Sequence, residues 1–463
     1  MTRKKLALLG GAPIRTSAFA SRPYLDEREL AAVTEVLSSG AVSQFVGSPI
    51  PGTRDVLGAK SHELENLDAA WSFVGGPRVR SFESAWSREI GSDYSISVNS
   101  ATSGLITALL ALELEPGSEV ITTPFSFTAT AAAIVLAHCV PVFIDIDPET
   151  FCLCPDALAR AVTSNTKAVV PVHWCGNAGD FSEILAITEA HGLRVIEDAA
   201  QVPATWYEGR ALGTYGDLGV FSFNQPKNVM TGEGGIVVTN DQYLAEKCRL
   251  IRNHGEAIVD DDDPDQYVAN SVGYNFRLTE LQAAIGFEQI AKIQEINDIR
   301  AANYEHLSGH IQTEFSDFLE PQRITHPDSY YAYTAAFRWY SDKHGVHRDS
   351  VAKALRAEGI PVFTGYQRLL SDHPMFKRKI AAGLGHYPWD SAHHKGQVDY
   401  SQLELPNARK LVGSEFLGFL QMGWPNTPSD MDDILRAFEK IIDNIDDLLA
   451  LENSVSPSFD LGK

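Results

Sequence analysis

The sequence has few of the features that mark several large classes of protein. Only five of its 463 residues are cysteines, and they are scattered through apolar segments: Cys139, Cys152, Cys154, Cys175 and Cys248. An odd number of scattered cysteines indicates reduced intracellular thiols rather than a disulfide framework. The Cys-Leu-Cys pair lacks the second pair that a zinc site needs, so no metal is expected. No apolar run approaches the ~20 residues of a membrane span, and the chain opens without a signal-peptide pattern, so we expect a cytoplasmic protein without membrane contact.

Basic residues are also scarce. The chain has 38 lysines and arginines against 60 aspartates and glutamates, which gives a formal net charge of −22. This balance argues against nucleic acid or an anionic membrane as a partner. Hydrophobic residues make up 44% of the chain and charged residues 21%, the balance of an ordinary globular protein. The length is enough for two or three domains, and no internal repeat or low-complexity tract interrupts them.

A regular alternation of apolar runs and helix-like stretches begins near residue 76. The apolar runs are Ser95–Val98, Glu119–Thr122, Val140–Asp145, Ala168–Val172, Leu193–Glu197, Leu218–Phe223 and Ile236–Thr239. Helical spacing lies between most of them, as in Gly104–Leu114, Thr128–Ala137, Pro155–Ala161 and Phe181–His191. Strands that alternate with helices predict an α/β fold with a mainly parallel sheet covered on both faces. Sites in such sheets lie at the carboxyl ends of the strands.

The regions before and after this alternation have different sequence patterns. Glu27 to Leu37 has helical spacing, with Leu30, Val33 and Leu37 on one side. After residue 325 a second pattern begins, with a strand over Tyr330–Tyr340 and a long final helix over Met431–Leu449. We therefore predict an N-terminal arm (1–75), a large domain (76–324), a smaller α+β C-terminal domain (325–452) and a frayed tail (453–463).

Two segments place reactive side chains just after apolar runs. They are Val195-Ile-Glu-Asp198-Ala-Ala-Gln201, and Ser222 with Lys227 and Gly232-Glu-Gly-Gly235. A lysine just past a buried strand loses water around its ammonium, which lowers its pKa and frees the amine for Schiff-base chemistry. A carboxylate at a strand end is the partner that the pyridinium nitrogen of pyridoxal phosphate requires. Each residue alone is usually structural or solvated, and the set is what points to this chemistry.

In their order and spacing, these segments resemble the DegT/DnrJ/EryC1/StrS sugar aminotransferases, a branch of the aspartate aminotransferase fold. The resemblance covers roughly Gly76 to Leu449. It implies a three-layer PLP-transferase fold with a mainly parallel central sheet, and a PLP-dependent aminotransferase. Such an enzyme moves an amino group from glutamate or glutamine to a keto-sugar or keto-cyclitol, in the biosynthesis of amino sugars, aminocyclitols, antibiotics or other secondary metabolites. An insertion from about Gln44 to Ser72 departs from the family and is expected to be a loop or a small helical excursion.

The resemblance also implies roles for individual residues. Lys227 would carry the cofactor as a Schiff base and move the proton, Asp198 would pair with the ring nitrogen, and Gln201 would reach the ring hydroxyl. Phe127 would stack on the ring, and Thr102, Ser103 and Ser222 would hold the phosphate. Ser100 to Gly104 also reads as an ordinary helix cap, so the phosphate role of Thr102 and Ser103 rests on the resemblance.

Three further residues have less specific patterns. Asn275 resembles a residue that the family contributes from the partner subunit, which implies a homodimer with shared active sites. His173 and Arg277 are candidate substrate residues, and each is as readily a structural hydrogen-bonding or ion-pair residue. The family usually has Leu-Tyr where this chain has Trp174-Cys175 after His173, a departure near the site that would alter which sugar is admitted.

Three other functions are compatible with alternating strands and helices. Some relatives are sugar dehydratases in which histidine replaces the lysine, and Lys227 argues against that outcome. A non-catalytic binding or regulatory relative would not need Asp198, Gln201 and Lys227 together. A nucleotide-dependent dehydrogenase would carry G-x-G-x-x-G after its first strand, and this fingerprint is missing.

Overall fold

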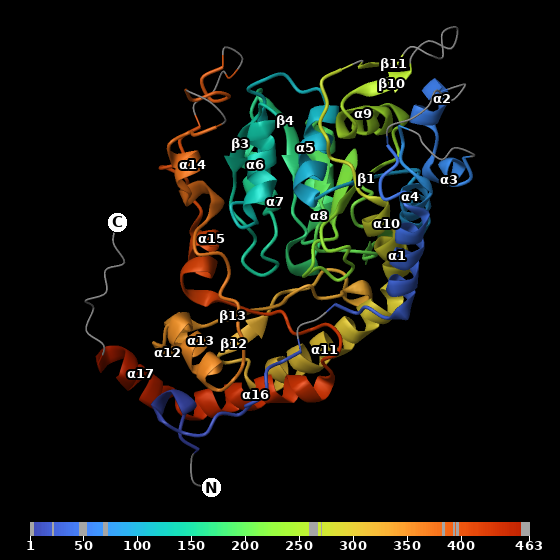
Figure 1. Ribbon diagram of the computed structural model, residues 1–463. Coiled ribbons are helices and arrows are strands. Elements are labelled where there is room, and N and C mark those ends of the chain that lie inside the picture. Colours follow the sequence, from blue (N-terminus) through green and yellow to red (C-terminus); the bar gives the residue numbers. More distant parts are fainter. Residues whose placement is uncertain are drawn as a thin grey trace.

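The architecture is that of a computed structural model, which describes residues 4–20, 23–45, 53–67, 73–258, 267–269, 271–381, 385–391, 394 and 398–454. Figure 1 shows a large central sheet with helices on both faces and, below it, a smaller sheet packed against long helices. No helix in the described part of the chain combines the length and the apolar character that a membrane crossing requires.

The central sheet has seven strands in the order β1-β9-β8-β5-β4-β2-β3. Their bounds are β1 (Tyr94–Val98), β2 (Glu119–Thr122), β3 (Val140–Phe143), β4 (Thr166–Val170), β5 (Arg194–Asp198), β8 (Leu218–Ser222) and β9 (Gly235–Thr239). Only β9 runs against its two neighbours, and the pairings among β3, β2, β4, β5 and β8 are all parallel. The predicted α/β fold with a mainly parallel sheet is confirmed. The sequence pattern showed it because parallel strands that are covered on both faces are apolar on both faces.

Helices cover the sheet on both sides. The bounds are α4 (Pro77–Ile90), α5 (Ala101–Ala111), α6 (Thr128–Leu136), α7 (Pro155–Ala161), α8 (Phe181–Ala190), α9 (Gln242–Arg252) and α10 (Glu280–Ile290). One apolar core joins α4, α7, α8 and α10 to the sheet, and a second core joins α5, α6 and α9 to its other face. Two cores on two faces make the three layers that the family resemblance implies.

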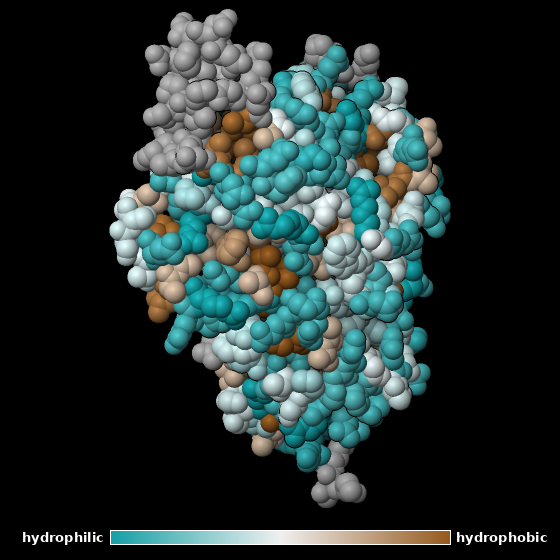
Figure 2. All heavy atoms as spheres, turned by 90° about the vertical axis from the view of Figure 1, so that its right-hand side faces the viewer, coloured by the Kyte–Doolittle hydropathy of each residue, from teal (hydrophilic) through white to brown (hydrophobic). Residues whose placement is uncertain are grey.

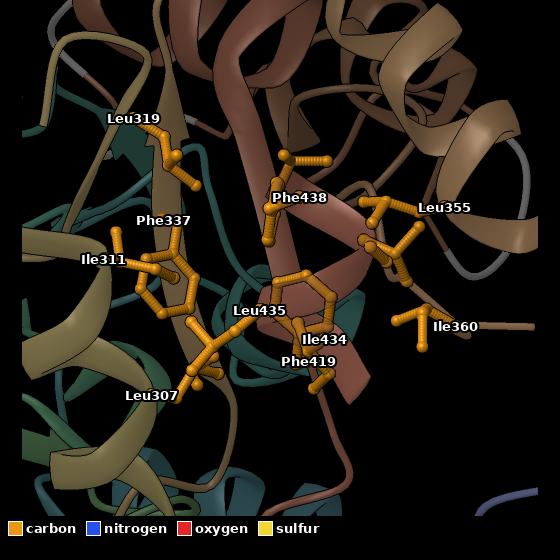
Figure 3. Close-up of a cluster of buried hydrophobic side chains, with 14 of the residues drawn as sticks. Leu307, Ile311, Leu319, Phe337, Leu355, Ile360, Phe419, Ile434, Leu435 and Phe438 are labelled. Carbon is orange, nitrogen blue, oxygen red and sulfur yellow. The ribbon is translucent and has the colours of Figure 1, made fainter. Parts of the chain in front are cut away.

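The smaller sheet is antiparallel and has the order β12-β13-β14, from β12 (Leu319–Pro321), β13 (Ala335–Trp339) and β14 (Phe416–Phe419). It packs against α11 (Ile293–Glu314), α13 (Arg348–Ala357) and α16 (Pro428–Asp443). Figure 3 shows this core, where Leu307, Phe337, Phe419 and Phe438 converge from different elements. The predicted division of the chain at residue 324 stays a prediction, and β12, which precedes it, pairs with β13.

The final helix differs from the prediction. Met431–Leu449 is two helices, α16 and α17 (Ile445–Ser454), that meet at Asn444. The Asn444 side chain donates to the carbonyl oxygens of Lys4 and Lys440, at 3.1 and 2.7 Å. The bond to Lys4 ties the N-terminal segment to the point where the two helices meet, a long-range contact that no local spacing reveals.

The N-terminal segment and the insertion lie beside the large domain. Helix α1 (Glu27–Ser39) packs on α10, and the insertion contains α2 (Thr53–Gly58) and α3 (Ser61–Leu64), next to α4 and α9 (Figure 1). The Arg249 guanidinium of α9 donates to the carbonyl oxygens of Val56, Leu57 and Ala59. The insertion thus holds a helical excursion anchored on α9. Its residues 46–52 and 68–72 lie outside the described part.

The remaining elements are short. Two hairpins are β6 (Trp206–Tyr207) with β7 (Arg210–Ala211), and β10 (Glu256–Ile258) with β11 (Tyr267–Ala269). Short helical segments are η1 (Ala7–Leu9), η2 (Trp174–Gly176), η3 (Pro327–Ser329), α12 (Ser341–His344), η4 (Leu370–Asp372), α14 (Pro374–Lys377), α15 (Pro406–Lys410) and η5 (Leu411–Glu415).

Candidate active site

A cavity of about 430 Å³ lies at the carboxyl ends of β5 and β8 and at the start of α5. Six of the residues singled out in the sequence line it: Thr102, Phe127, Asp198, Gln201, Ser222 and Lys227. A larger cavity, of about 660 Å³, lies between α11 and β12 and contains none of them. We assign the site to the smaller cavity because it brings a buried carboxylate and a lysine together at the strand ends, where open α/β sheets bind ligands.

Asp198 ends β5 and is 5% exposed. Its Oδ2 accepts a hydrogen bond from the Thr130 hydroxyl at 2.8 Å, and its Oδ1 accepts the N–H of Ala200 at 3.3 Å. Thr130 in turn shares a hydrogen bond of 2.8 Å with Ser126. Burial raises the pKa of Asp198 above its ordinary value, and the bond from Thr130 partly offsets this. The two hydrogen bonds thus orient the carboxylate, but they do not fully offset the cost of burying its negative charge.

Lys227 lies in the loop between β8 and β9, and its Nζ is 4.1 Å from the ring centre of Tyr333. Loss of water around the ammonium lowers the pKa of Lys227 to about 8, although the negative charge of Asp198 opposes the shift. The loop is closed by a hydrogen bond from the N–H of Gln225 to Gly232, whose φ of +83° favours glycine. This lysine therefore has a much larger neutral fraction near neutral pH than an exposed one.

The opposite end of the cavity is the start of α5. The Ser100 hydroxyl caps the helix by accepting the N–H of Ser103 at 3.1 Å. Among the described residues, the N–H groups of Ala101 and Thr102 have no hydrogen-bond partner. A Cβ at Gly235 would lie 2.6 Å from the amide nitrogen of Ala101, so β9 passes close against this turn. Free N–H groups at a helix start, with hydroxyls beside them, form a binding site for an anion such as phosphate.

Two of the predicted cofactor residues have part of their hydrogen-bonding capacity occupied. Ser103 does not line the cavity, and its hydroxyl donates to Asn99 at 2.5 Å. The Gln201 Oε1 accepts the N–H of Cys175 at 2.7 Å, so only its amide NH₂ has no partner within the described chain. Ser103 therefore supports the turn, and Gln201 faces the cavity with a donor.

Asn275, Arg277 and His173 do not line the cavity. Asn275 is exposed, and its Oδ1 accepts from the Arg277 Nε at 2.8 Å. His173 is buried, with its Nε2 at 2.9 Å from the Glu197 Oε2, and its ring makes a T-shaped contact with Phe181. The geometry of His173 is that of a structural residue under the strand ends.

Six polar lining residues were given no individual role from the sequence: Ser126, Thr130, Asn224, Glu233, Tyr333 and Tyr366. Ser126 and Thr130 flank Phe127, so a search for hydroxyls beside that residue would have found them. Tyr333 and Tyr366 come from beyond residue 325, and no local pattern links them to the strand ends.

A covered, mainly parallel sheet with a lysine and a carboxylate in one cavity at its strand ends is an arrangement that suits the PLP-dependent transferases. Residues 59–396 match the DegT/DnrJ/EryC1/StrS aminotransferase family. The chain belongs to this family of PLP-dependent aminotransferases and is an aminotransferase.

Relatives from bacteria share most of the chain. It is 31% identical over 456 residues to a putative L-glutamine:3-amino-2,3-dideoxy-scyllo-inosose aminotransferase of Streptomyces kanamyceticus, which covers 96% of this chain and 99% of that protein. It is 33% identical over 395 residues to the spore coat polysaccharide biosynthesis protein SpsC of Bacillus subtilis, with 82% and 94% covered. The solved aminotransferase of Psychrobacter cryohalolentis has a TM-score of 0.74 and 28% identity, and covers 92% of this chain and 99% of its own.

Proposed function

We propose that the protein transfers the amino group of glutamine or glutamate to a ketone on a sugar or cyclitol ring, with pyridoxal phosphate as cofactor. The observation that carries the proposal is the placement of Lys227 and Asp198 in one cavity with the open start of α5. The name of the Streptomyces kanamyceticus relative contains L-glutamine as the donor and an inosose as the acceptor. This supports glutamine and a keto-cyclitol here, in the biosynthesis of amino sugars or aminocyclitols.

The cavity residues fit pyridoxal phosphate at three points. The start of α5, with Thr102 and Ser222, offers donors to the phosphate. Asp198 is buried and needs a positive partner, which a protonated ring nitrogen provides. Lys227 supplies an amine of lowered pKa. The volume of about 430 Å³ lies in the range of small-molecule sites.

The bound cofactor supplies an electron sink for the carbon that carries the amino group. Asp198 holds the ring nitrogen protonated, and Thr130 keeps the carboxylate in place for this. Lys227 accepts a proton at Nζ and returns it, a role suited to a pKa of about 8. Phe127, 59% exposed within a single chain, offers its ring face to the cofactor.

The proposal includes a homodimer with shared sites. Asn275 and Arg277 lie outside the cavity of their own chain, and Asn275 is exposed at the surface. Asn275 is nonetheless close to the α5 turn, because the Asn99 amide is 3.5 Å from its carbonyl oxygen. A partner placed against this side would bring its own Asn275 to the neighbouring phosphate end.

The test compares wild type with Lys227→Ala and with Lys167→Ala, an exposed lysine whose ammonium bonds only a backbone carbonyl among the described groups. After reconstitution with pyridoxal phosphate, borohydride reduction and peptide mass spectrometry should find the cofactor on Lys227 in wild type and the control. In a separate sample that is not reduced, L-glutamine should bleach the visible absorption of the bound cofactor. A wild-type protein that binds no cofactor, or that binds it and takes no amino group from glutamine or glutamate, would falsify the proposal.

A further inference from the structure

One wall of the cavity is aromatic. The rings of Phe125, Phe127, Trp174 and Phe363 surround Tyr366, and we call these five residues the aromatic wall. Tyr366 lies 5.4 Å from Trp174, 6.0 Å from Phe363 and 6.1 Å from Phe125, measured between ring centres. Phe127 completes the contact at 6.4 Å. Of the five residues, only Phe127 and Tyr366 line the cavity. Because its ring is held on several sides, Tyr366 presents its hydroxyl in a defined orientation.

The Tyr366 hydroxyl makes no hydrogen bond within the described chain, and the same holds for the hydroxyl of Tyr333, which lines the same cavity. Phenol hydroxyls that lose water usually find a hydrogen-bond partner. Burial raises the pKa of both phenols, so both stay protonated and can donate. Tyr333 is already in contact with the Lys227 ammonium through its ring, which leaves Tyr366 as the phenol free of the reacting lysine.

Trp174 and its neighbour Cys175 connect Tyr366 to Gln201, a second residue that lines the cavity. It is buried in η2, with its ring 4.6 Å from Phe125 and against Tyr366. The next residue, Cys175, donates its N–H to Gln201, another lining residue. The turn η2 therefore supports two lining side chains at once.

We propose that Tyr366 is a specificity-determining residue that hydrogen-bonds a ring hydroxyl of the keto acceptor, and that Trp174 is a positioning residue for Tyr366. This inference rests on the proposed transamination. A polyhydroxylated ring ketone has hydroxyls to meet the phenol and C–H faces to pack on the aromatic wall, whereas glutamine has no hydroxyl. Tyr366 should therefore act on the acceptor half-reaction and spare the donor half-reaction.

The experiment measures the two half-reactions of the full-length holoenzyme separately. The donor half-reaction is followed by the loss of cofactor absorption with L-glutamine, and the acceptor half-reaction by its return with scyllo-inosose or a dTDP-linked 4-keto-hexose. Tyr366→Phe should raise the KM for the accepted ketone about threefold to tenfold, the worth of one neutral hydrogen bond. The donor half-reaction should stay within about twofold. Tyr243→Phe, on the exposed face of α9, is the matched control and should change neither.

Trp174→Leu, which removes the ring that packs on Tyr366, should raise the acceptor KM with a smaller effect on kcat. Trp174→Phe should restore most of the loss because an aromatic ring again packs on Tyr366. Equal slowing of both half-reactions by Tyr366→Phe, or no change in either, would overturn the inference. So would a wild-type enzyme that takes the amino group from glutamine but passes it to neither ring ketone. Failure of wild type in the donor half-reaction would instead contradict the proposed transamination.

Discussion

Asp198 and Lys227 lose water in the same cavity, and burial shifts their pKa values in opposite directions. Burial raises the pKa of the carboxyl group and lowers the pKa of the ammonium, since in each case it disfavours the charged form. The attraction between the two charges offsets part of each shift. The pair is therefore ready for a cofactor that brings a positive ring nitrogen to one residue and an aldehyde to the other.

The lowered pKa of Lys227 predicts the pH dependence of cofactor uptake. Only the neutral amine attacks an aldehyde, so the rate at which the apoenzyme takes up pyridoxal phosphate should rise with pH up to about 8 and then level off. A lysine of the ordinary pKa of 10.5 would give a rate that keeps rising to about that pH. Stopped-flow absorption across this range distinguishes the two curves.

The same shift has a consequence for stability. Between pH 8 and 10.5 the unfolded chain binds the Lys227 proton and the folded chain does not, so this lysine makes the apoenzyme more stable as pH rises through that window. Lys227→Met should remove this part of the pH dependence. Equal pH dependence of urea unfolding in wild type and mutant would contradict the assignment.

Thr130 supports Asp198 through a hydrogen bond from its hydroxyl group. Thr130→Val keeps the shape of the side chain and removes the donor to the carboxylate, so the pKa of Asp198 should rise further and cofactor affinity should fall about tenfold. The change is measured by titrating the apoenzyme with pyridoxal phosphate. Thr128→Val, on the same first turn of α6 and outside the cavity lining, is the control. An unchanged Kd for Thr130→Val would show that the hydrogen bond to Asp198 does not contribute to cofactor binding.

At the scale of elements, β5 serves two purposes because successive strand side chains point to opposite faces. Asp198 faces the cavity, and Glu197 lies fully buried on the other side. The Glu197 carboxylate accepts the N–H groups of Gly213, Tyr215 and Gly216 at 2.7, 2.6 and 2.8 Å. With His173 at 2.9 Å, it ties β5 to the turn that leads into β8.

Glu197→Ala should therefore loosen the frame of the site. It leaves several buried donors without an acceptor, so we expect a loss of about 3–5 kcal/mol in unfolding free energy. Urea unfolding followed by circular dichroism gives the value. Glu197→Gln keeps one acceptor oxygen and should lose less. If both variants unfold at the wild-type urea concentration, the network does not support β5.

At the scale of the whole molecule, α1 places apolar side chains at the surface. Leu30 and Leu37 are 68% and 58% exposed, whereas Ala32 and Val36 are buried against α10. Figure 2 looks onto the side of the molecule where α1 lies and shows hydrophobic residues gathered near the middle of this face. A contiguous exposed apolar surface is typical of protein interfaces, which supports the proposed homodimer.

Leu30→Glu with Leu37→Glu should disrupt this interface. Two charges on the α1 face would have to be desolvated in a dimer, so light scattering should show monomers, and cofactor affinity should fall because each site loses the partner's residues. Ser38→Glu, exposed on the same helix, is the control for added charge. A double mutant that remains dimeric would show that α1 is not part of the interface.

Whether a part of the molecule could be predicted depends on how far apart in the sequence its interacting residues lie. The strands, and the positions of Asp198 and Lys227 just beyond them, depend on residues near in sequence, so apolar runs and the motif located them. Tyr333 and Tyr366 reach the cavity through packing between distant segments, and no local pattern links them to the strand ends.

The sequence by itself determined the α/β alternation, the helix over Glu27–Leu37 and the order of reactive residues along the chain, because these depend on periodicity and short spacing. Only the tertiary structure decided that Leu30 and Leu37 face outward, that His173 supports Glu197 from below, and that the last helix breaks at Asn444. The physical reason is that the burial of a side chain depends on which surface arrives from elsewhere in the chain. Helical spacing defines two sides of α1 but cannot say which side α10 will cover.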